Sequence, residues 1–269
     1  MLQRLMHLFA ICLACSLAQQ VLAAPLLEYT VLDTAEHSTD SFIQGLVYEN
    51  GLLYESSGLY SRSYLVVYKA DSGEEVKRQA LPSAIFAEGL SMVNKELFLL
   101  TWHKGILFRL DATTLKVKRT TRYSGEGWGL AKVGQHLIMS NGSNLLSLRD
   151  ADTFNELKKI PVLENNREID KLNELEFDGS DLWANRWQTH LIYRINPRDG
   201  KVTGKLDLSA LYPLGQTHPR PDVLNGIAFV PEKNAFWVSG KKWSKRYLIQ
   251  IKPRAATSGA PQENTANPP

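Results

Sequence analysis

The chain has 269 residues, of which 43% are hydrophobic and 22% are charged, and its formal net charge at pH 7 is +3. This composition excludes an intrinsically disordered chain, and the small positive charge argues against a nucleic-acid partner, which needs a clustered basic face. The length suits one large all-β domain or two ordinary domains.

The first 24 residues have the features of a cleavable secretory signal peptide. One basic residue, Arg4, precedes an apolar stretch of about 14 residues from Leu5 to Ala18, and Ala23 and Ala24 form a small-residue cleavage site. A membrane-spanning anchor is the alternative, but a span needs roughly 20 apolar residues. We therefore expect a periplasmic or secreted protein with no stable membrane association after cleavage.

Both cysteines, Cys12 and Cys15, lie within this leader segment. Its removal leaves a mature chain without cysteine, so the core and not a disulfide bond must stabilise the fold. A lipid anchor on Cys15 is a further alternative, although the three preceding residues match a lipidation pattern poorly.

The body of the chain, from about residue 26 to residue 252, contains an internal repeat of short β-type runs. Each of five units opens with a polar or aromatic residue that is followed two positions later by an apolar anchor, and the anchors are 40 to 52 residues apart. Second and third runs follow in every unit, and a fourth run fits residues 75–78, 117–120, 156–159 and 202–205. Four short strands at this spacing are typical of a β-propeller blade.

The fifth unit has no fourth strand after Ile251, and the segment Leu27–Val31 is free to supply it. Such a strand would close the ring and remove an open sheet edge. The sequence therefore predicts an all-β fold, a five-bladed β-propeller of four-stranded antiparallel blades, over residues 25–252. A two-sheet sandwich is the alternative fold.

Two segments fall outside this repeat. Residues 212–222 are rich in proline, lengthen the last spacing, and are expected to form an insertion near the pocket. Residues 253–269 have no periodicity and much Pro, Ala and polar content, so they predict a disordered tail. The charged stretch Glu164–Lys171 predicts a solvated loop between blades.

The repeat brings polar and aromatic residues together at one mouth of the central channel. The first strand of each blade lines that channel, so the five opening residues surround its axis: Gln44, Glu88, Trp128, Asn173 and Asn225. The ends of the second strands form another ring: Gly58, Trp102, Gly142, Trp187 and Lys241. We expect the three ring tryptophans to wall a ligand pocket, with packing between blades as the alternative.

Glu88 is the main candidate for chemistry within these rings. Apolar walls disfavour an ionised carboxylate and raise its pKa, which suits a group that takes and gives a proton near neutral pH. Lys241 would stabilise a developing oxyanion, with an N–H of Asn173 beside it. The alternative for Glu88 is a structural carboxylate that accepts backbone N–H groups. The histidines show no metal-ligand spacing, so we expect no metal and no cofactor.

Several motifs carry a resemblance to a known family. They occur in order and at the blade spacing over about residues 36–252: Phe42-Ile-Gln-Gly-Leu46, Phe86-Ala-Glu-Gly-Leu90, Tyr123-Ser-Gly-Glu-Gly-Trp-Gly-Leu130, Leu172-Asn-Glu-Leu-Glu176, Ala184-Asn-Arg-Trp187, Val223-Leu-Asn-Gly-Ile227 and Val238-Ser-Gly-Lys241. Together they resemble the plant and bacterial glutaminyl cyclases, which are glutaminyl-peptide cyclotransferases of the five-bladed propeller type.

The resemblance implies a metal-independent acyltransferase that converts the N-terminal glutamine of peptides and proteins to pyroglutamate and releases ammonia. It implies that Glu88 is the general acid and base, and that Asn173 and Lys241 hold and polarise the γ-carboxamide. Gln44 would help to fix the substrate.

The same resemblance implies a pocket formed by one phenylalanine and three tryptophans, namely Phe42, Trp102, Trp128 and Trp187. Glu126 and Glu174 lie close to the rings in sequence and are expected to support the site without being catalytic. We expect a monomer. Two alternatives remain: a non-catalytic periplasmic propeller that binds peptides or glycans, and a metal-dependent propeller lactonase or esterase.

Overall fold

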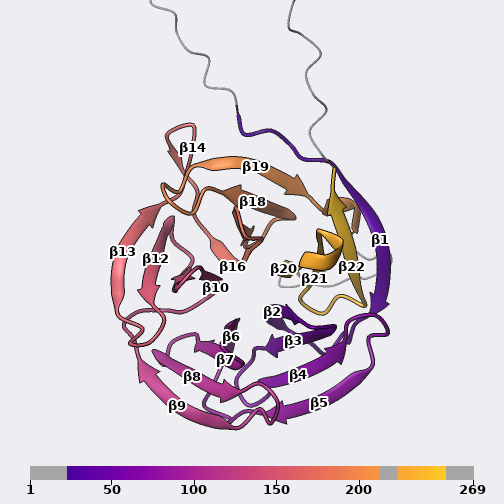
Figure 1. Ribbon diagram of the computed structural model, residues 1–269, viewed down its shortest axis with the longest axis vertical. Helices are drawn as coiled ribbons and strands as arrows, with labels where there is room; N and C mark the ends of the chain where they lie inside the picture. Colours follow the sequence, from indigo (N-terminus) through magenta and orange to yellow (C-terminus); the bar gives the residue numbers. More distant parts are fainter. Residues whose placement is uncertain (1–22, 212–222, 253–269) are drawn as a thin grey trace, which may run out of the picture.

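The computed structural model describes residues 23–211 and 223–252, and it arranges them as a ring of five four-stranded sheets around a central axis (Figure 1). Within each sheet the neighbouring strands are antiparallel. The predicted five-bladed β-propeller is therefore confirmed. We number the blades in chain order, from blade 1 to blade 5.

The strands of the first four blades run from the channel to the rim in chain order. Blade 1 comprises β2 (Ile43–Glu49), β3 (Leu52–Ser57), β4 (Tyr64–Lys69) and β5 (Glu75–Ala80). Blade 2 comprises β6 (Ala87–Val93), β7 (Glu96–Thr101), β8 (Ile106–Asp111) and β9 (Val117–Arg122). Blade 3 comprises β10 (Leu130–Val133), β11 (His136–Met139), β12 (Leu145–Asp150) and β13 (Glu156–Pro161). Blade 4 comprises β16 (Leu172–Phe177), β17 (Leu182–Arg186), β18 (Leu191–Ile195) and β19 (Val202–Asp207).

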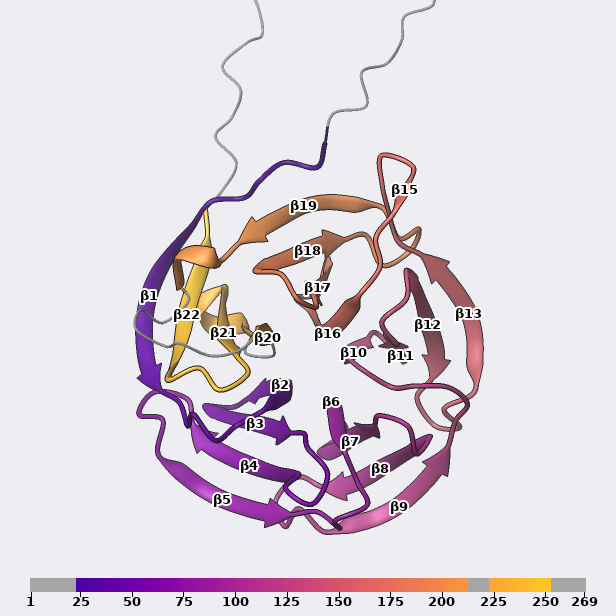
Figure 2. The same cartoon turned by 180° about the vertical axis from the view of Figure 1, so that it is seen from behind.

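Blade 5 joins the two ends of the described chain. Its three inner strands are β20 (Leu224–Val230), β21 (Ala235–Gly240) and β22 (Lys245–Ile251), and its outer strand is β1 (Tyr29–Glu36). Strand β1 pairs antiparallel with β22, from Tyr29 opposite Ile251 to Glu36 opposite Lys245 (Figure 2). The expectation that an N-terminal strand closes the ring is confirmed.

The closing strand is shifted from the predicted segment Leu27–Val31. It begins at Tyr29 and continues to Glu36, because Leu27 belongs to the seam with blade 4. There the amide of Leu27 donates to the carbonyl of Lys205 over 2.8 Å, and its side chain lies against Gly204. The N-terminal segment therefore spans two blades.

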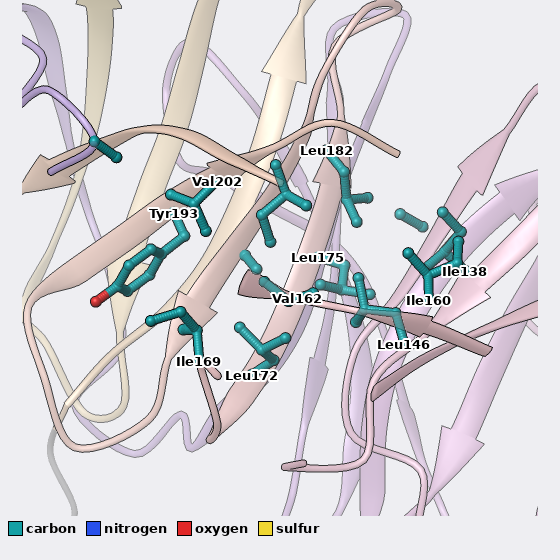
Figure 3. Packing of buried hydrophobic residues seen from close by; sticks show 14 residues of the cluster. Ile138, Leu146, Ile160, Val162, Ile169, Leu172, Leu175, Leu182, Tyr193 and Val202 are labelled. Carbon is teal, nitrogen blue, oxygen red and sulfur yellow. The ribbon is translucent and has the colours of Figure 1, made fainter. Parts of the chain in front are cut away.

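Burial follows the distance of a strand from the axis. Buried residues predominate in the inner strands, whereas the outer strand β5 is exposed at five of its six positions. The middle strands are covered by a blade on each face, which explains continuous apolar runs such as Tyr64–Tyr68. Figure 3 shows one such core, where Ile138, Leu146 and Ile160 of blade 3 meet apolar residues of blade 4. The core is thus a series of layers between blades.

The charged stretch Glu164–Lys171 lies between blades 3 and 4 and is exposed or half-buried at all but one position, as predicted, but it is not a loop throughout. It contains a small hairpin of β14 (Leu163–Glu164) and β15 (Arg167–Glu168) that projects from the rim (Figure 1). Glu164 accepts hydrogen bonds from the backbone amide of Ala24, over 3.0 Å, and from Nζ of Lys205, over 2.8 Å. Hydrogen bonds to residues distant in sequence therefore order a segment that charge alone marked as a loop.

Residues 1–22, 212–222 and 253–269 lie outside the described residues. The predicted signal peptide, proline-rich insertion and C-terminal tail lie there almost entirely, so they stay predictions. The described part of the chain contains no helix that is long and apolar enough to cross a membrane. Its helical elements are two short 3-10 turns, Ser209–Leu211 and Pro231–Lys233.

Candidate active site

One mouth of the central channel holds a cavity of about 260 Å³. All eight residues that the sequence predicts for the site line this cavity, and two further residues join them. The lining consists of Phe42, Gln44, Leu59, Phe86, Glu88, Trp102, Trp128, Asn173, Trp187 and Lys241. The convergence follows from the repeat, because the starts of inner strands and the ends of second strands meet at this mouth.

The polar floor of the cavity is formed by Gln44 and Glu88, which lie on β2 and β6 and are almost fully buried. Nε2 of Gln44 lies 3.4 Å from Oε1 of Glu88. Asn225, on β20, donates from Nδ2 to Oε1 of Gln44 over 3.1 Å and to the carbonyl of Ile43 over 3.1 Å. Asn225 therefore orients Gln44 and does not itself line the cavity.

Glu88 lies in an environment that favours its protonated form. Burial raises its pKa well above the ordinary value; the positive charge of Lys241 opposes this increase, and the negative charge of Glu126 adds to it. The backbone carbonyl of Glu88 accepts a hydrogen bond of 2.6 Å from Oγ of Ser56, which fixes this part of β6. The carboxyl group therefore holds a proton more readily than an exposed glutamate does, as a group that both takes and gives a proton requires.

Lys241 faces the same cavity and is 4% exposed. Burial lowers its pKa to about 8, although the charges of Glu88 and Glu174 oppose that effect. Its Nζ lies 4.6 Å from the centre of the Phe42 ring, and its backbone amide donates to the carbonyl of Val223. The cavity thus contains a buried cation beside a buried acid, and burial disfavours the charged form of each.

Asn173 lies on β16, where its carboxamide lines the cavity. Its Oδ1 has no hydrogen-bond partner among residues 23–211 and 223–252, so this oxygen is not committed to a structural contact. The hydroxyl group of Ser140 donates to the backbone carbonyl of Asn173 over 2.6 Å. The same hydroxyl oxygen accepts a hydrogen bond from the backbone amide of Gly129 over 2.7 Å. These bonds fix the start of β16 against blade 3.

The walls of the cavity are aromatic, as the sequence predicts. The rings of Trp128 and Trp187 meet edge to face, with centroids 5.5 Å apart and planes at 88°. On another side, the ring centroid of Phe86 lies 6.4 Å from that of Phe42 and 5.2 Å from that of Trp102. Such pairs hold large rings in fixed orientations, and they surround the acid and the cation with apolar surface.

Sequence reasoning missed two residues of the lining, Phe86 and Leu59. Phe86 lies two positions before Glu88, just as Phe42 lies two positions before Gln44, so the repeat itself contained the signal. Leu59 follows β3 in a loop and has a φ of 97°, an unusual conformation for a residue with a side chain. No sequence pattern marks it.

The two glycines of the second ring make room for the aromatic walls. A Cβ atom added to Gly142, whose φ is 81°, would lie 2.7 Å from the ring of Trp128. A Cβ at Gly58 would overlap the ring of Phe86. These ring positions therefore require glycine because an aromatic side chain fills the space, from the same blade at Gly142 and from the next blade at Gly58.

Glu174 is fully buried and does not line the cavity. Its Oε1 accepts the amide of Leu46 over 2.9 Å, whereas its Oε2 has no partner within the part of the chain that the structure describes. Burial raises the pKa of Glu174 well above its ordinary value, and the charges of Glu176 and Glu88 contribute to the increase. This geometry agrees with a supporting carboxylate and not with direct contact to a ligand.

Comparison with known proteins identifies the family of the chain. The family model for glutamine cyclotransferase matches residues 6–251. The chain belongs to the glutamine cyclotransferase family. It is 38% identical over 236 residues to a glutaminyl-peptide cyclotransferase of Arabidopsis thaliana, an alignment that covers 86% of this chain and 74% of that relative.

A solved relative confirms the fold of the chain. The chain superimposes on the crystal structure of Myxococcus xanthus glutaminyl cyclase with a TM-score of 0.80 and 33% sequence identity. The match covers 85% of this chain and 98% of the other. Among the residues that the structure describes, no group of three or more His, Cys, Asp or Glu side chains is placed to hold a metal ion.

Proposed function

We propose that this chain is a glutaminyl-peptide cyclotransferase that converts the N-terminal glutamine of peptides and proteins to pyroglutamate. The observation that carries the proposal is the buried carboxyl group of Glu88, which lies in an aromatic cavity together with Lys241 and Asn173. Family membership and the relative named for this activity support it. The reaction needs one proton shuttle and one site for a developing negative charge, and the cavity offers both.

Glu88 carries the proton through the reaction. As a carboxylate it takes a proton from the substrate α-amine while that nitrogen attacks the γ-carboxamide carbon. The new carbon–nitrogen bond gives a tetrahedral intermediate. Glu88 then gives its proton to the former amide nitrogen, the bond from carbon to that nitrogen breaks, and ammonia leaves. Because its pKa is raised, Glu88 serves in both directions, and it ends the cycle as a carboxylate.

Lys241 and Asn173 act on the oxygen of the γ-carboxamide. Negative charge develops there as the amine attacks, and fixed donors stabilise it most strongly in a site that excludes water. Lys241, whose pKa is about 8, is largely cationic at neutral pH. Gln44 is held by Asn225 and helps to fix the substrate beside Glu88.

The walls contribute by shape and by exclusion of water. Cyclisation joins two groups of the same residue, so a cavity that folds the side chain back onto its own amine supplies much of the rate. A volume of about 260 Å³ suits one such residue. The rings of Phe42, Trp102, Trp128 and Trp187 also keep out water, which would otherwise compete as the nucleophile.

The two alternative functions make different demands on the cavity. A propeller that only binds peptides or glycans needs the aromatic walls but not a buried acid that can exchange a proton. A metal-dependent lactonase needs several oxygen ligands around a cation, whereas among residues 23–211 and 223–252 the single carboxylate that lines the cavity is accompanied by Lys241. The donor set of this cavity therefore favours the cyclotransferase.

The activity is tested with the purified chain and a dipeptide that begins with glutamine. We expect release of ammonia together with a product lighter by one ammonia, as measured by a coupled ammonia assay and by mass spectrometry. A dipeptide with glutamine in the second position is the control and should not react. Absence of both products from the N-terminal glutamine substrate would contradict the proposal.

Export, a monomeric state and independence from metal form part of the same proposal. Residues 1–24 have the pattern of a signal peptide, and the cavity holds a lysine where a metal site would hold anions. We expect a mature N-terminus at Ala24 or Pro25 in the exported fraction. N-terminal mass analysis checks the cleavage, and gel filtration with light scattering checks the monomer.

A further inference from the structure

Glu126 links two walls of the cavity without lining it. The residue lies between β9 and β10, where its Oε2 accepts a hydrogen bond from Nε1 of Trp102 over 2.8 Å and from Nε1 of Trp128 over 2.9 Å. Trp102 follows β7 of blade 2, and Trp128 precedes β10 of blade 3. One carboxylate oxygen therefore joins side chains that come from two blades.

The second oxygen of Glu126 faces outward to His103. Nδ1 of His103 lies 3.4 Å from Oε1, and the side chains of His103 and Glu126 are 48% and 41% exposed. The imidazole also stacks on the indole of Trp102, with ring centroids 3.8 Å apart and planes at 28°. Trp102 is thus held at its N–H by Glu126 and on one face by His103.

Two properties of Glu126 bear on the reaction. Hydrogen bonds to an ionised acceptor are stronger than neutral ones, so the two indoles are fixed before substrate arrives, which reduces the ordering cost of binding. In addition, the negative charge of Glu126 raises the pKa of Glu88. This effect is smaller than that of burial, and the positive charge of Lys241 acts in the opposite direction. Glu174 and Tyr123 also interact electrostatically with Glu88, from β16 and from the segment after β9.

We propose that Glu126 is a positioning residue of the proposed cyclotransferase, which fixes Trp102 and Trp128 across the seam between blades 2 and 3 and acts through its charge on Glu88. This inference rests on the proposed function for its kinetic consequences. Its structural half, the fixing of the two indoles, stands on the hydrogen bonds alone. Two substitutions separate the effect of the hydrogen bonds from the effect of the charge.

Glu126→Gln removes the charge and keeps an oxygen that can accept both indole N–H groups. We expect KM for a glutamine dipeptide to stay within about threefold of the native value, because the indoles remain bonded. We also expect the acidic limb of the kcat/KM profile to move to lower pH. The direction follows because kcat/KM rises as Glu88 ionises, and loss of a nearby negative charge lowers the pKa of Glu88.

Glu126→Ala removes both the charge and the acceptor. We expect KM to rise by roughly tenfold or more while kcat falls less, since the walls that bind the substrate lose their fixed orientation. The tryptophan bands of the near-ultraviolet circular dichroism spectrum should weaken in this variant and stay unchanged in Glu126→Gln. The control is Glu168→Gln on the exposed hairpin strand β15, which should match the native protein in every measurement.

The outcomes distinguish the inference from the proposed function. A native chain without ammonia release contradicts the function, and the circular dichroism spectra then decide whether Glu126 fixes the indoles. With an active native chain, a Glu126→Gln variant that keeps the native acidic limb overturns the action on Glu88. A folded Glu126→Ala variant with native KM and native tryptophan bands overturns the positioning role. If Glu126→Ala does not fold, Glu126→Leu, which also removes the acceptor but keeps most of the side-chain volume, replaces it in the KM and circular dichroism measurements, with the same outcome overturning the positioning role.

Discussion

Gly142 and Trp128 show how closely single residues are matched around the cavity. The indole of Trp128 lies where a side chain at position 142 would begin, and Gly142 also has a φ of 81°. Gly51, in the turn between β2 and β3, has the same φ of 81° but no atom within 4 Å of an added Cβ. Substitutions at Gly51 and Gly142 therefore share the same backbone strain, and only the one at Gly142 also displaces the indole.

Gly142→Ala is expected to impair substrate binding, whereas Gly51→Ala is not. Each substitution should destabilise the fold by about 1 kcal/mol through its positive φ. Only Gly142→Ala also pushes Trp128 from its position, so its KM should rise by roughly tenfold. Steady-state kinetics and denaturant unfolding measure both effects. Equal KM values in the two variants would show that Trp128 does not depend on Gly142.

Glu88→Gln is expected to stabilise the fold increasingly as the pH rises. Burial raises the pKa of Glu88 above its value in the unfolded chain, so between these two pKa values the folded state holds a proton that the unfolded state has lost. Stability contributed by this group is therefore lost with rising pH. The urea concentration at the unfolding midpoint should exceed the native value by more at about pH 8.5 than at about pH 5. A constant difference would contradict the raised pKa.

At the scale of elements, the seam between blade 5 and blade 1 contains a buried ionic cluster. Glu55, on β3, lies 3.1 Å from Nε2 of His37 and 3.6 Å from Arg246 of β22, and all three side chains are fully buried. Oγ of Ser41 also donates to Glu55. Burial by itself raises the pKa of Glu55, but His37, Arg246 and Ser41 outweigh it and lower the pKa to about 2.

Glu55→Gln is expected to destabilise the protein by about 3 kcal/mol at neutral pH, because it leaves Arg246 as an uncompensated buried charge. Because the pKa of Glu55 is lower in the folded protein, its contribution to stability is fully present above the pKa of the unfolded chain, near 4.5. It is lost as the pH falls toward 2. The difference from the native protein should therefore shrink over that range in denaturant titrations. Glu49→Gln, an exposed change on β2, is the control and should have little effect at any pH.

The elements also show which parts of the fold the sequence can predict. The repeat located the four strands of blades 1 to 4 and the three inner strands of blade 5, because each blade repeats one local pattern. The prediction placed the closing strand too early in the chain, because a β-type run does not specify its partner. Leu27 contacts blade 4, and the pairing with β22 begins at Tyr29. The hairpin at Glu164 was missed because its order depends on contacts with Ala24 and Lys205, which are distant in sequence.

At the scale of the whole molecule, the propeller converts a repeat in sequence into a ring of different side chains. All eight predicted site residues meet because equivalent positions of five blades surround one axis. What sequence could not predict depends on contacts between blades, such as the two indoles that share one oxygen of Glu126. The loop position of Leu59 could not be predicted either, because it depends on an unusual backbone conformation after β3.

Activity of the whole molecule is expected to be insensitive to chelators and to reductants. The cavity pairs one carboxylate with a lysine, and both cysteines lie at positions 12 and 15, within the predicted leader. Incubation with excess EDTA, followed by the ammonia assay, should leave kcat unchanged, and dithiothreitol should leave the melting temperature of the mature chain unchanged. Loss of activity that zinc or calcium restores would contradict this prediction.

The central claim is that Glu88 moves the proton during cyclisation, and the kinetics of Glu88→Gln on a glutamine dipeptide test it most directly. The substitution keeps the size of the side chain and removes its ability to accept and return a proton. We predict that kcat for pyroglutamate formation falls by roughly 100-fold to 10,000-fold while KM stays within about threefold. A folded variant that retains kcat close to the native value would contradict the account.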